Sequence, residues 1–488
     1  MKKAELVFIA YPGSGCIVST VGIAKYLLTQ HEHLFATVLV MKLPFHSTYD
    51  VVTYTQSLSS SSSSISKRIN FIDLPQENTY ADSIAADFLR QFLEDQKLHV
   101  KNAVAKLMDS RRSTCSDDSP RLTGFVVDVL CTTMIDVADE FGIPSYVFLT
   151  SGAGFLSLLF HLLQLHDEEN VDPTQFKNDP TAELVVPGFL NRVPARVLPG
   201  VMLDKDLAPT MMGYARKIRG SKGIMVNTFM ELESCAIRSL SDDDAKFPPV
   251  YPVGPILNLN AHPNIIGSDI TKWLDDQPPS SVVFLCFGTI GSFSRDQVKE
   301  IAIALENSGV RFVWSLRKPP SKMAFAMPGN YADLEEILPK EFLDRTAEIG
   351  RIIGWAPQVD ILSHQAVGGF VSHCGWNSTL KSLWFGVPIA TLPLKSEQQL
   401  NAFELVKELG LGVEIKIDHR GCFYGGNEHS IVSAKEIELG IKRVMEVDSD
   451  TRKRVKEMSE KSRRALMDGG SSYSSLNDFI KTLMDGLP

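Results

Sequence analysis

The sequence predicts an α/β fold with two Rossmann-like domains, each built on a doubly wound parallel sheet and facing the other across a cleft. Three observations lead to this expectation. Short apolar segments of strand length alternate with helical patterns in both halves of the chain, which is typical of parallel sheets. A Pro-rich stretch separates the two series. The chain of 488 residues is also too long for a single hydrophobic core.

The first half begins with a strand and an amphipathic helix. ELVFIAY reads as a buried strand, and Val21, Ala24 and Leu28 share one face of the helical pattern that follows. The Ser-run SLSSSSSSISK, residues 57–67, is expected to be a loop because it cannot build a core. A helix is expected at 132–142. Further strands are expected at residues 35–43, 69–75, 124–130, 144–150 and 223–229.

The second half repeats the alternation after a change of texture. FPPVYPVGPILNLN is Pro-rich and DDQPPSS is polar and broken by Pro, so both read as a linker. We therefore expect domains at 1–246 and 281–465, a linker at 247–280, and a last helix in 466–488. The second series places strands at 281–288, 310–316, 350–357, 367–373 and 388–394, and helices at 295–309, 376–386, 402–412 and from 434 onward.

Composition narrows the class of partner. The net charge of -9 argues against nucleic acid or an anionic membrane as the main partner, because both require a basic face. No apolar run approaches the length of a membrane span. Seven scattered cysteines, never spaced as C-x-x-C, favour a reducing compartment, free thiols and no metal site. We expect a cytoplasmic protein that acts on a small molecule without nucleic acid or membrane.

The turn after the first strand contains a cysteine that requires an explanation. Residues 12–20 read PGSGCIVST, which is a Gly-rich turn leading into a helix N-terminus. Ligands and reactive groups in doubly wound proteins sit at such turns. Cys16 could be a reactive thiolate there, since a helix N-terminus lowers a thiol pKa. It could equally be a small and inert filler.

The stretch from Trp355 to Gln399, WAPQVDILSHQAVGGFVSHCGWNSTLKSLWFGVPIATLPLKSEQQ, closely resembles the donor-binding box of plant family-1 UDP-glycosyltransferases. Similar segments extend over nearly the whole chain, among them VVDVLCTTMIDVADEFGIPSYVFLTSGAGFL and SVVFLCFGTIGSF. The resemblance implies the GT-B fold, with an acceptor pocket in the first half and a UDP-sugar site in the second. It also implies that the last helix, near Ser471 to Met484, packs on the first domain.

The residue types of the box suit a nucleotide sugar. Trp355 offers an aromatic face and Gln358 an amide edge for a uracil. His373 to Ser378 form a strand-to-helix turn whose backbone N–H groups favour a diphosphate, with Asn377 as a further donor. A second turn with Thr289, Gly291 and Ser292 is expected to face the same place. The resemblance further implies that Glu397 and Gln398, which match the family's acidic residue and glutamine, hold sugar hydroxyls.

The sequence departs from the family pattern at the residues that perform the reaction. The family places a histidine base after the first strand and an aspartate that orients it; Cys16 and Asp128 stand at these positions. A thiol with a reference pKa near 8.5 is a poor match for that task. Lys381 replaces the usual ribose-binding glutamate, Leu392 replaces the usual tryptophan beside the sugar, and Lys395-Ser396 replaces a Tyr-Ala pair.

These departures leave three hypotheses. The first expects that UDP-glucose transfer is lost, that UDP-sugar binding is doubtful, and that Cys16 or Asp128 catalyses acyl transfer or a rearrangement of an apolar or phenolic metabolite. The second is a working UDP-sugar-dependent O-glycosyltransferase with a base other than histidine, sufficient for an acidic phenol. The third is a ligand-binding relative without catalysis. A monomer is expected in each case.

Overall fold

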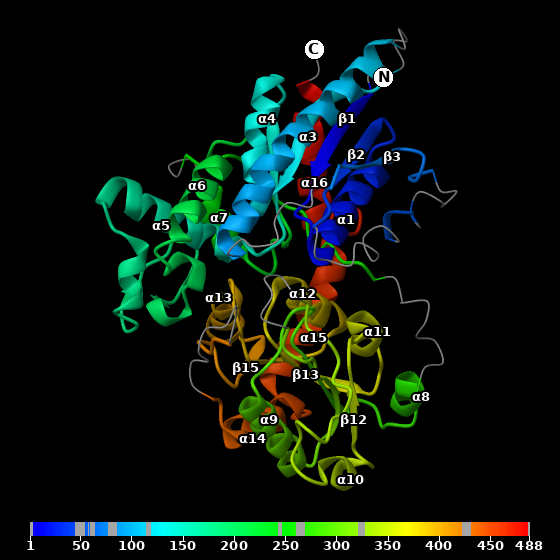
Figure 1. The fold of residues 1–488 in the computed structure, drawn as a ribbon, viewed down its shortest axis with the longest axis vertical. Helices are drawn as coiled ribbons and strands as arrows, with labels where there is room; N and C mark the ends of the chain where they lie inside the picture. The colour runs from blue at the N-terminus through cyan, green and yellow to red at the C-terminus, as the bar shows by residue number, and fades with distance from the viewer. Residues whose placement is uncertain are drawn as a thin grey trace. The chain divides into compact units, whose positions relative to one another are not determined.

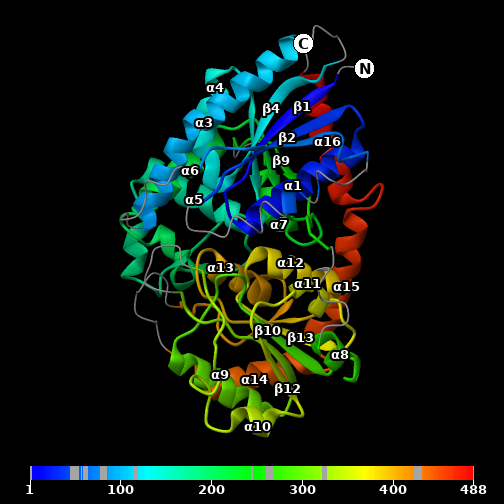
Figure 2. The same ribbon diagram turned by 45° about the vertical axis from the view of Figure 1, so that its right-hand side comes forward.

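Two parallel sheets, each in its own unit, form the framework of the protein (Figures 1 and 2). Unit 1 comprises residues 1–172, 206–258 and 464–488, and unit 2 comprises 173–205 and 259–463. The computed structural model describes residues 3–43, 54–56, 58, 64–76, 85–113, 119–242, 246–259, 269–320, 327–421 and 431–486. Most of the predicted Ser-rich loop, and Cys115 and Cys422, lie outside the described residues.

The described residues of unit 1 form a seven-stranded parallel sheet in the order β3-β2-β1-β4-β5-β8-β9. The strand order reverses at β1, which pairs with β2 on one side and β4 on the other. Its strands are β1 (Ala4–Ile9), β2 (Leu34–Val40), β3 (Ile69–Asp73), β4 (Arg121–Asp128), β5 (Ser145–Leu149), β8 (Ile224–Val226) and β9 (Val250–Pro252). Its helices are α1 (Ser14–Gln30), α3 (Ala85–Ser113), α4 (Ile135–Glu140), α5 (Ala153–Glu169), α6 (Ala208–Arg219), α7 (Ser234–Leu240) and α16 (Ser471–Asp485), with a 3-10 turn η1 (Val129–Met134).

Unit 2 repeats the plan with a six-stranded parallel sheet in the order β12-β11-β10-β13-β14-β15. The order reverses here between β10 and β13. Its strands are β10 (Val282–Cys286), β11 (Arg311–Ser315), β12 (Gly350–Ile353), β13 (Val367–Ser372), β14 (Ile389–Thr391) and β15 (Gly412–Glu414). Its helices are α8 (Asp269–Asp275), α9 (Arg295–Ser308), α10 (Phe342–Thr346), α11 (Gln358–Leu362), α12 (Trp376–Phe385), α13 (Gln398–Phe403), the π-helical η6 (Glu404–Glu408), α14 (Ala434–Met445) and most of α15 (Asp450–Ala465). Residues 173–205 add η2 (Pro173–Lys177), the antiparallel pair β6 (Glu183–Leu184) and β7 (Val193–Pro194), η3 (Ala195–Val197) and η4 (Gly200–Met202).

The fold predicted from the alternating pattern is confirmed, because each predicted strand of the core corresponds to a strand of one sheet. β1 is buried along its whole length, as expected for a central strand covered on both faces. Val21, Ala24 and Leu28 of α1 are buried in the same core. α16 closes that core with Phe479, whose ring meets Tyr146 and Tyr251 at centroid distances of 5.0 and 5.4 Å. The last helix therefore belongs to unit 1 (Figure 2).

Two boundaries differ from the contiguous division predicted from the sequence. Residues 173–205 lie in unit 2, because Glu408 accepts the backbone N–H groups of Leu190 and Asn191 at 2.8 and 2.9 Å and Arg420 donates to the Leu198 carbonyl at 2.6 Å. The predicted linker at 247–280 is partly regular structure. It contains β9, which is the edge strand of the first sheet, and α8 of unit 2.

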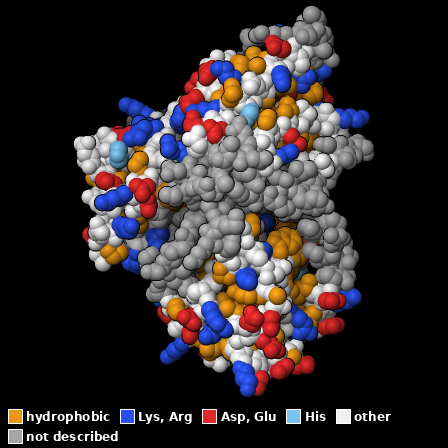
Figure 3. All heavy atoms as spheres, viewed as in Figure 1, with side chains coloured by type: hydrophobic (Ala, Val, Ile, Leu, Met, Phe, Trp, Pro, Cys, Tyr) orange, Lys and Arg blue, Asp and Glu red, His pale blue; other side chains and the backbone are white. Residues whose placement is uncertain are grey.

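The face of the molecule shown in Figure 3 has no dominant charge among its described residues. Basic and acidic side chains of these residues are interspersed there. Among the residues whose structure is described, no helix is both long and apolar enough to cross a bilayer.

Candidate functional site

The candidate sites lie at the carboxyl ends of the strands where each sheet reverses its order. Ligands of doubly wound proteins bind at this edge, since two neighbouring loops there diverge to opposite faces. In unit 1 the reversal brings together the turn after β1 and the end of β4. In unit 2 it brings together the turns after β10 and β13. The predicted site residues sit on these turns or on the segments beside them.

Asp128 and Cys16 meet at the reversal point of unit 1. Asp128 is the last residue of β4, is 1% exposed, and caps η1 through a hydrogen bond from Leu130 N–H to Oδ1 at 2.9 Å. Cys16 lies in the first turn of α1 and is partly exposed. Its backbone N–H donates to the Gly13 carbonyl at 3.0 Å. Cys16 follows β1 on α1 and Asp128 ends the adjacent strand β4, so the two side chains come from neighbouring parts of the sheet edge.

The environment of Asp128 makes this carboxyl a stronger base than an exposed aspartate. Burial raises its pKa to about 6, while the Leu130 N–H and the Cys16 thiol oppose the rise by stabilising the ionised form. Oδ2 is buried and makes no hydrogen bond of normal geometry, although the Cys16 thiol faces the carboxylate closely enough to stabilise its charge. The pair can therefore share a proton, with Asp128 as the stronger acceptor near neutral pH.

A third group near this pair was not anticipated from the sequence. Cys131 of η1 is fully buried, and burial together with the charges of Asp128 and Cys16 raises its pKa. The thiol therefore stays protonated at neutral pH. A cysteine inside an ordinary helical pattern, three residues after Asp128, carries no motif that would have singled it out.

His373 holds the two turns of unit 2 together. It follows β13 and is 9% exposed. Its ring lies so close to the turn backbones that a Cβ at Gly288 or at Gly375 would be 2.6 Å from Nε2. Gly288 also has a φ of +77°, which favours glycine. Burial, followed by the charge of Lys395, lowers the pKa of His373 to about 3, so the imidazole is neutral.

Both turns present groups that can bind an anion. Helix α12 begins at Trp376 after its N-cap residue Gly375, and Asn377 and Ser378 lie in its first turn. A helix N-terminus carries N–H donors and a positive dipole. The turn after β10 places Thr289 exposed and Ser292 partly exposed on the neighbouring strand end. The sequence expected these two turns to face one place, and the approach of Gly288 to His373 brings them into contact.

A side-chain network joins α11 to α12 beside these turns. Gln358 Nε2 donates to Ser378 Oγ at 3.0 Å, and Lys381 Nζ donates to Gln358 Oε1 at 3.2 Å. Trp355 precedes the network and is 48% exposed. Lys381, which stands where the family pattern has a glutamate, is therefore part of this hydrogen-bond network. Its pKa is lowered by burial.

The segment after β14 has one residue in an unexpected environment. Gln398 Oε1 accepts the backbone N–H groups of Leu394 and Lys395 at 2.9 and 3.0 Å, so its carbonyl fixes the loop. Glu397 is the residue at the N-cap position of α13 beside it. Leu392 was expected to line the sugar pocket, but it is fully buried in the unit 2 core because it continues from β14 into the sheet interior.

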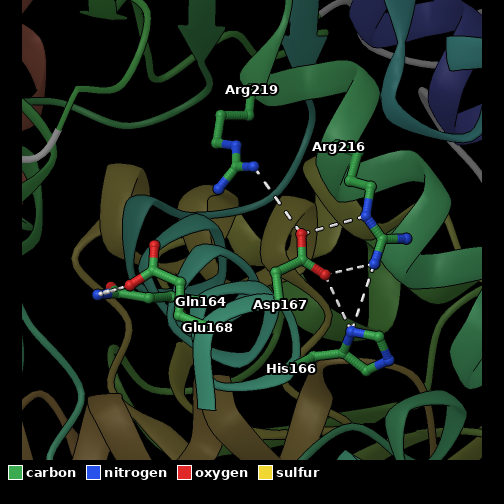
Figure 4. Close-up of polar contacts among 6 residues, drawn as sticks. All are labelled: Gln164, His166, Asp167, Glu168, Arg216 and Arg219. Carbon is green, nitrogen blue, oxygen red and sulfur yellow. Dashed lines mark hydrogen bonds and ion pairs between the residues drawn. The ribbon is translucent and has the colours of Figure 1, made fainter. Parts of the chain in front are cut away.

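Titratable side chains also gather away from these turns, on α5 and α6 of unit 1 (Figure 4). Asp167 pairs with Arg216 and accepts a contact from His166 Nδ1 at 2.9 Å. The hydrogen bond from Arg216 lowers the pKa of Asp167 to about 2. This exposed cluster ties the two helices together. No group of three or more potential metal ligands occurs among the described side chains.

Comparisons with known proteins agree with this geometry. The family profile described as UDP-glucoronosyl and UDP-glucosyl transferase matches residues 217–420. The UDP-glucose flavonoid 3-O-glucosyltransferase 6 of Fragaria ananassa is 55% identical, over 98% of this chain and 99% of its own. A transferase from Siraitia grosvenorii, solved in complex with UDP, is 49% identical with a TM-score of 0.88, over 99% of this chain and 100% of its own. A Medicago truncatula structure complexed with UDP-glucose is 40% identical with a TM-score of 0.83, over 99% of this chain and 98% of its own.

These similarities overturn the expectation of non-glycosyl chemistry. Relatives that align over nearly the full chain are named glucosyltransferases or hold UDP and UDP-glucose. The expectation was wrong because it counted three replacements as three losses. Leu392 is a core residue, and Lys381 joins the hydrogen-bond network of the box. The replacement at Cys16 still leaves a buried carboxylate of raised pKa beside it.

Proposed function

We propose, from the premise that the chain belongs to the UDP-glucuronosyl and UDP-glucosyl transferase family, that it transfers a sugar from a UDP-sugar to the hydroxyl of a small phenolic acceptor. The donor would bind at the turns after β10 and β13 of unit 2. The acceptor would bind beside Cys16 and Asp128 in unit 1. The observation that carries the proposal is the contact between the two turns of unit 2 at His373, beside the network of Gln358, Ser378 and Lys381.

The roles proposed in the donor site follow from the side-chain chemistry. The Trp355 ring and the Gln358 amide would hold the uracil, by stacking and by hydrogen bonding. The N-terminus of α12, with Asn377 and Ser378, would hold the diphosphate, helped by Thr289 and Ser292. Glu397 and Gln398 would bind hydroxyl groups of the sugar. His373 would stay neutral and keep the turns in place.

The proton of the acceptor hydroxyl would pass to the carboxylate of Asp128. Asp128 is buried, so the partly exposed Cys16 thiol is the group that can face a bound acceptor. The thiol sulfur would accept the phenolic proton as the thiol gives its own proton to Asp128. The phenolic oxygen, now more nucleophilic, would attack the anomeric carbon while the bond to the UDP oxygen breaks. UDP then leaves with the electron pair of that bond.

A weak relay of this kind favours acidic acceptors. A phenol of low pKa needs little help to lose its proton, whereas an aliphatic alcohol needs a strong base. The flavonoid acceptor in the name of the Fragaria ananassa relative is a phenolic compound of this kind. We therefore propose flavonoid-type phenols as the acceptor class and expect aliphatic alcohols to be poor acceptors.

The test is release of UDP from UDP-sugars with a graded series of phenols, together with detection of the glycoside by mass spectrometry. The natural chain should turn over the acidic phenols, and its rate should fall steeply as the phenol pKa rises. Cys16→His should flatten this dependence by supplying an imidazole base. Cys235→Ser is the matched control, because Cys235 is an exposed free thiol of α7. Absence of glycoside with every donor and phenol would refute the proposal.

A further inference from the structure

The loop that carries the proposed sugar-binding residues is fixed by an amide side chain. This loop comprises residues 392–397 and joins β14 to α13. Gln398, the first residue of α13, accepts the backbone N–H groups of Leu394 and Lys395 on Oε1 at 2.9 and 3.0 Å. Glu397 ends the loop at the N-cap position of the helix. A shift of the loop backbone would therefore displace both side chains that are proposed to bind the sugar.

A second segment, residues 418–421 after β15, supports the same loop. His419 is 4% exposed, and its Nδ1 lies 3.0 Å from the Pro393 carbonyl oxygen. Because a carbonyl oxygen only accepts, Nδ1 is the protonated nitrogen of this imidazole. The Gly421 N–H donates to the Leu394 carbonyl at 3.0 Å. The segment therefore binds two consecutive carbonyl groups of the loop.

Segment 418–421 is held in turn by residues that lie between α5 and α6 in the sequence. Arg420 donates to the backbone carbonyls of Arg196 and Leu198 at 3.1 and 2.6 Å. The Arg196 guanidinium lies 3.3 Å from the Asp418 carboxylate. Each of the two segments therefore supplies an arginine that contacts the other, and both belong to unit 2.

We propose, resting on the proposed transfer from a UDP-sugar, that His419 and Arg420 are positioning residues for the donor sugar, and that residues 195–198 contribute through them to sugar selectivity. An error of about 1 Å in the position of a binding group can lower a rate about 100-fold, so support of the loop affects how well its side chains meet the sugar hydroxyls. The nucleotide has its own elements, α11 and the N-terminus of α12. Changes at His419 or Arg420 should therefore affect the sugar more than UDP.

Another residue of α13 is expected to act on the diphosphate instead. Asn401 Nδ2 donates to the Cys374 carbonyl at 2.9 Å. Cys374 has a φ of +61° and lies in the turn that leads into α12. Asn401 therefore supports the turn proposed for the diphosphate, whereas Arg420 supports the loop proposed for the sugar. The two residues allow effects on nucleotide and sugar to be separated.

The experiment measures the affinities of UDP and of UDP-glucose by calorimetry, because their ratio reports the contribution of the sugar. Arg420→Met and His419→Leu should each weaken UDP-glucose about 3- to 10-fold, the range of one hydrogen bond, and change UDP little. Asn401→Ala should weaken both ligands by the same factor. Arg351→Met is the matched control, because the exposed Arg351 of β12, at the other edge of the sheet, also donates to two backbone carbonyls, at 2.6 and 2.7 Å.

Initial rates with one acidic phenol provide a second readout. In Arg420→Met the KM for UDP-glucose should rise, and the KM for the phenol should stay the same. The ratio of kcat/KM for UDP-glucose to that for UDP-galactose, which differs only in configuration at C-4 of the sugar, should move toward 1. Arg420→Lys keeps one charged donor and should show an intermediate loss of this selectivity.

The inference fails by itself when the natural chain transfers the sugar and both Arg420→Met and His419→Leu leave the ratio of affinities and the donor selectivity unchanged. It also fails when these variants weaken UDP as much as UDP-glucose. If Arg420→Met does not fold, Arg420→Lys decides, and unchanged selectivity in that variant overturns the inference. Absence of both UDP binding and transfer in the natural chain would instead refute the proposed function together with the inference.

Discussion

Replacing Asp128 with asparagine should make the protein less active and more stable at the same time. The substitution keeps the size of the side chain, and the amide oxygen can still accept the Leu130 N–H. It removes the negative charge and the ability to take a proton. In the proposed reaction the transfer rate with an acidic phenol should fall about 10²- to 10⁴-fold, the usual contribution of a general base.

The stability effect can be estimated from the pKa of the buried carboxyl. Burial raises that pKa from 3.8 to about 6, so the folded state holds the proton more tightly than the unfolded chain does. Folding is then unaffected by ionisation below about pH 4 and becomes less favourable as pH rises through 6. The difference of about 2 pKa units corresponds to roughly 3 kcal/mol above pH 6. Asparagine avoids this cost because it never ionises.

The assay is the melting temperature of the parent and of Asp128→Asn across pH 4 to 8, alongside glycoside formation. The variant should melt higher than the parent at pH 7.5, and the difference should shrink toward pH 4. Asp136→Asn is a matched control, since Asp136 is only partly buried and its pKa is lowered by Lys217 and Lys97. A variant that transfers sugar at the parent rate would refute the role of Asp128. A stability difference that does not depend on pH would refute the charge argument.

Three further changes test other parts of the structure. Gly288→Ala should weaken UDP binding about tenfold in calorimetry. The new Cβ would lie 2.6 Å from His373 Nε2, and the backbone φ of +77° is unfavourable for alanine. Unchanged affinity would contradict the packing of the two turns. Glu5→Ala should lower the free energy of unfolding by about 1 to 2 kcal/mol in a urea titration, because it removes the buried carboxylate of β1 that accepts hydrogen bonds from Thr37 and from Arg111 of α3. Glu32→Ala, on the surface, should change it little, and an equal loss in both variants would contradict the role of burial. Asp167→Asn should lower the melting temperature at neutral pH and have less effect as pH falls below about 4. The hydrogen bond from Arg216 lowers the pKa of Asp167 to about 2, and the stabilisation by this ion pair is lost when the carboxylate is protonated. An effect that persists in acid would contradict the ion pair.

The fold was predictable because its signals are local and repeated. Apolar residues recur with the period of a strand or a helix in the first strand and in the helix with Val21, Ala24 and Leu28. These residues are buried in the core of unit 1. The association of residues 173–205 with unit 2 was not predictable. It depends on Glu408 reaching the backbone of Leu190 and Asn191, a long-range contact without a periodic signal. The same holds for β9, which is a short edge strand inside a Pro-rich segment.

The candidate sites were predictable in position and less so in environment. Strand-to-helix turns at the points of reversal direct attention to Cys16 and to His373 from sequence alone. The burial of Leu392 was missed because a leucine after a strand reads equally as a pocket wall or as core. The shared proton of Cys16 and Asp128, and the pKa of Lys395, depend on burial that arises only when the loops pack.

The residues that depart from the family pattern are ones that carry charge or transfer protons. The helices and loops that hold these residues are intact. Cys16 occupies the first turn of an intact helix next to an intact carboxylate. Lys381 and Lys395 occupy a helix and a loop whose hydrogen bonds to Gln358 and Gln398 are complete. A decaying site would lose these supports before or together with the reacting side chains. Their retention favours a working transferase whose proton acceptor has changed, and the test with phenols of graded pKa measures that change.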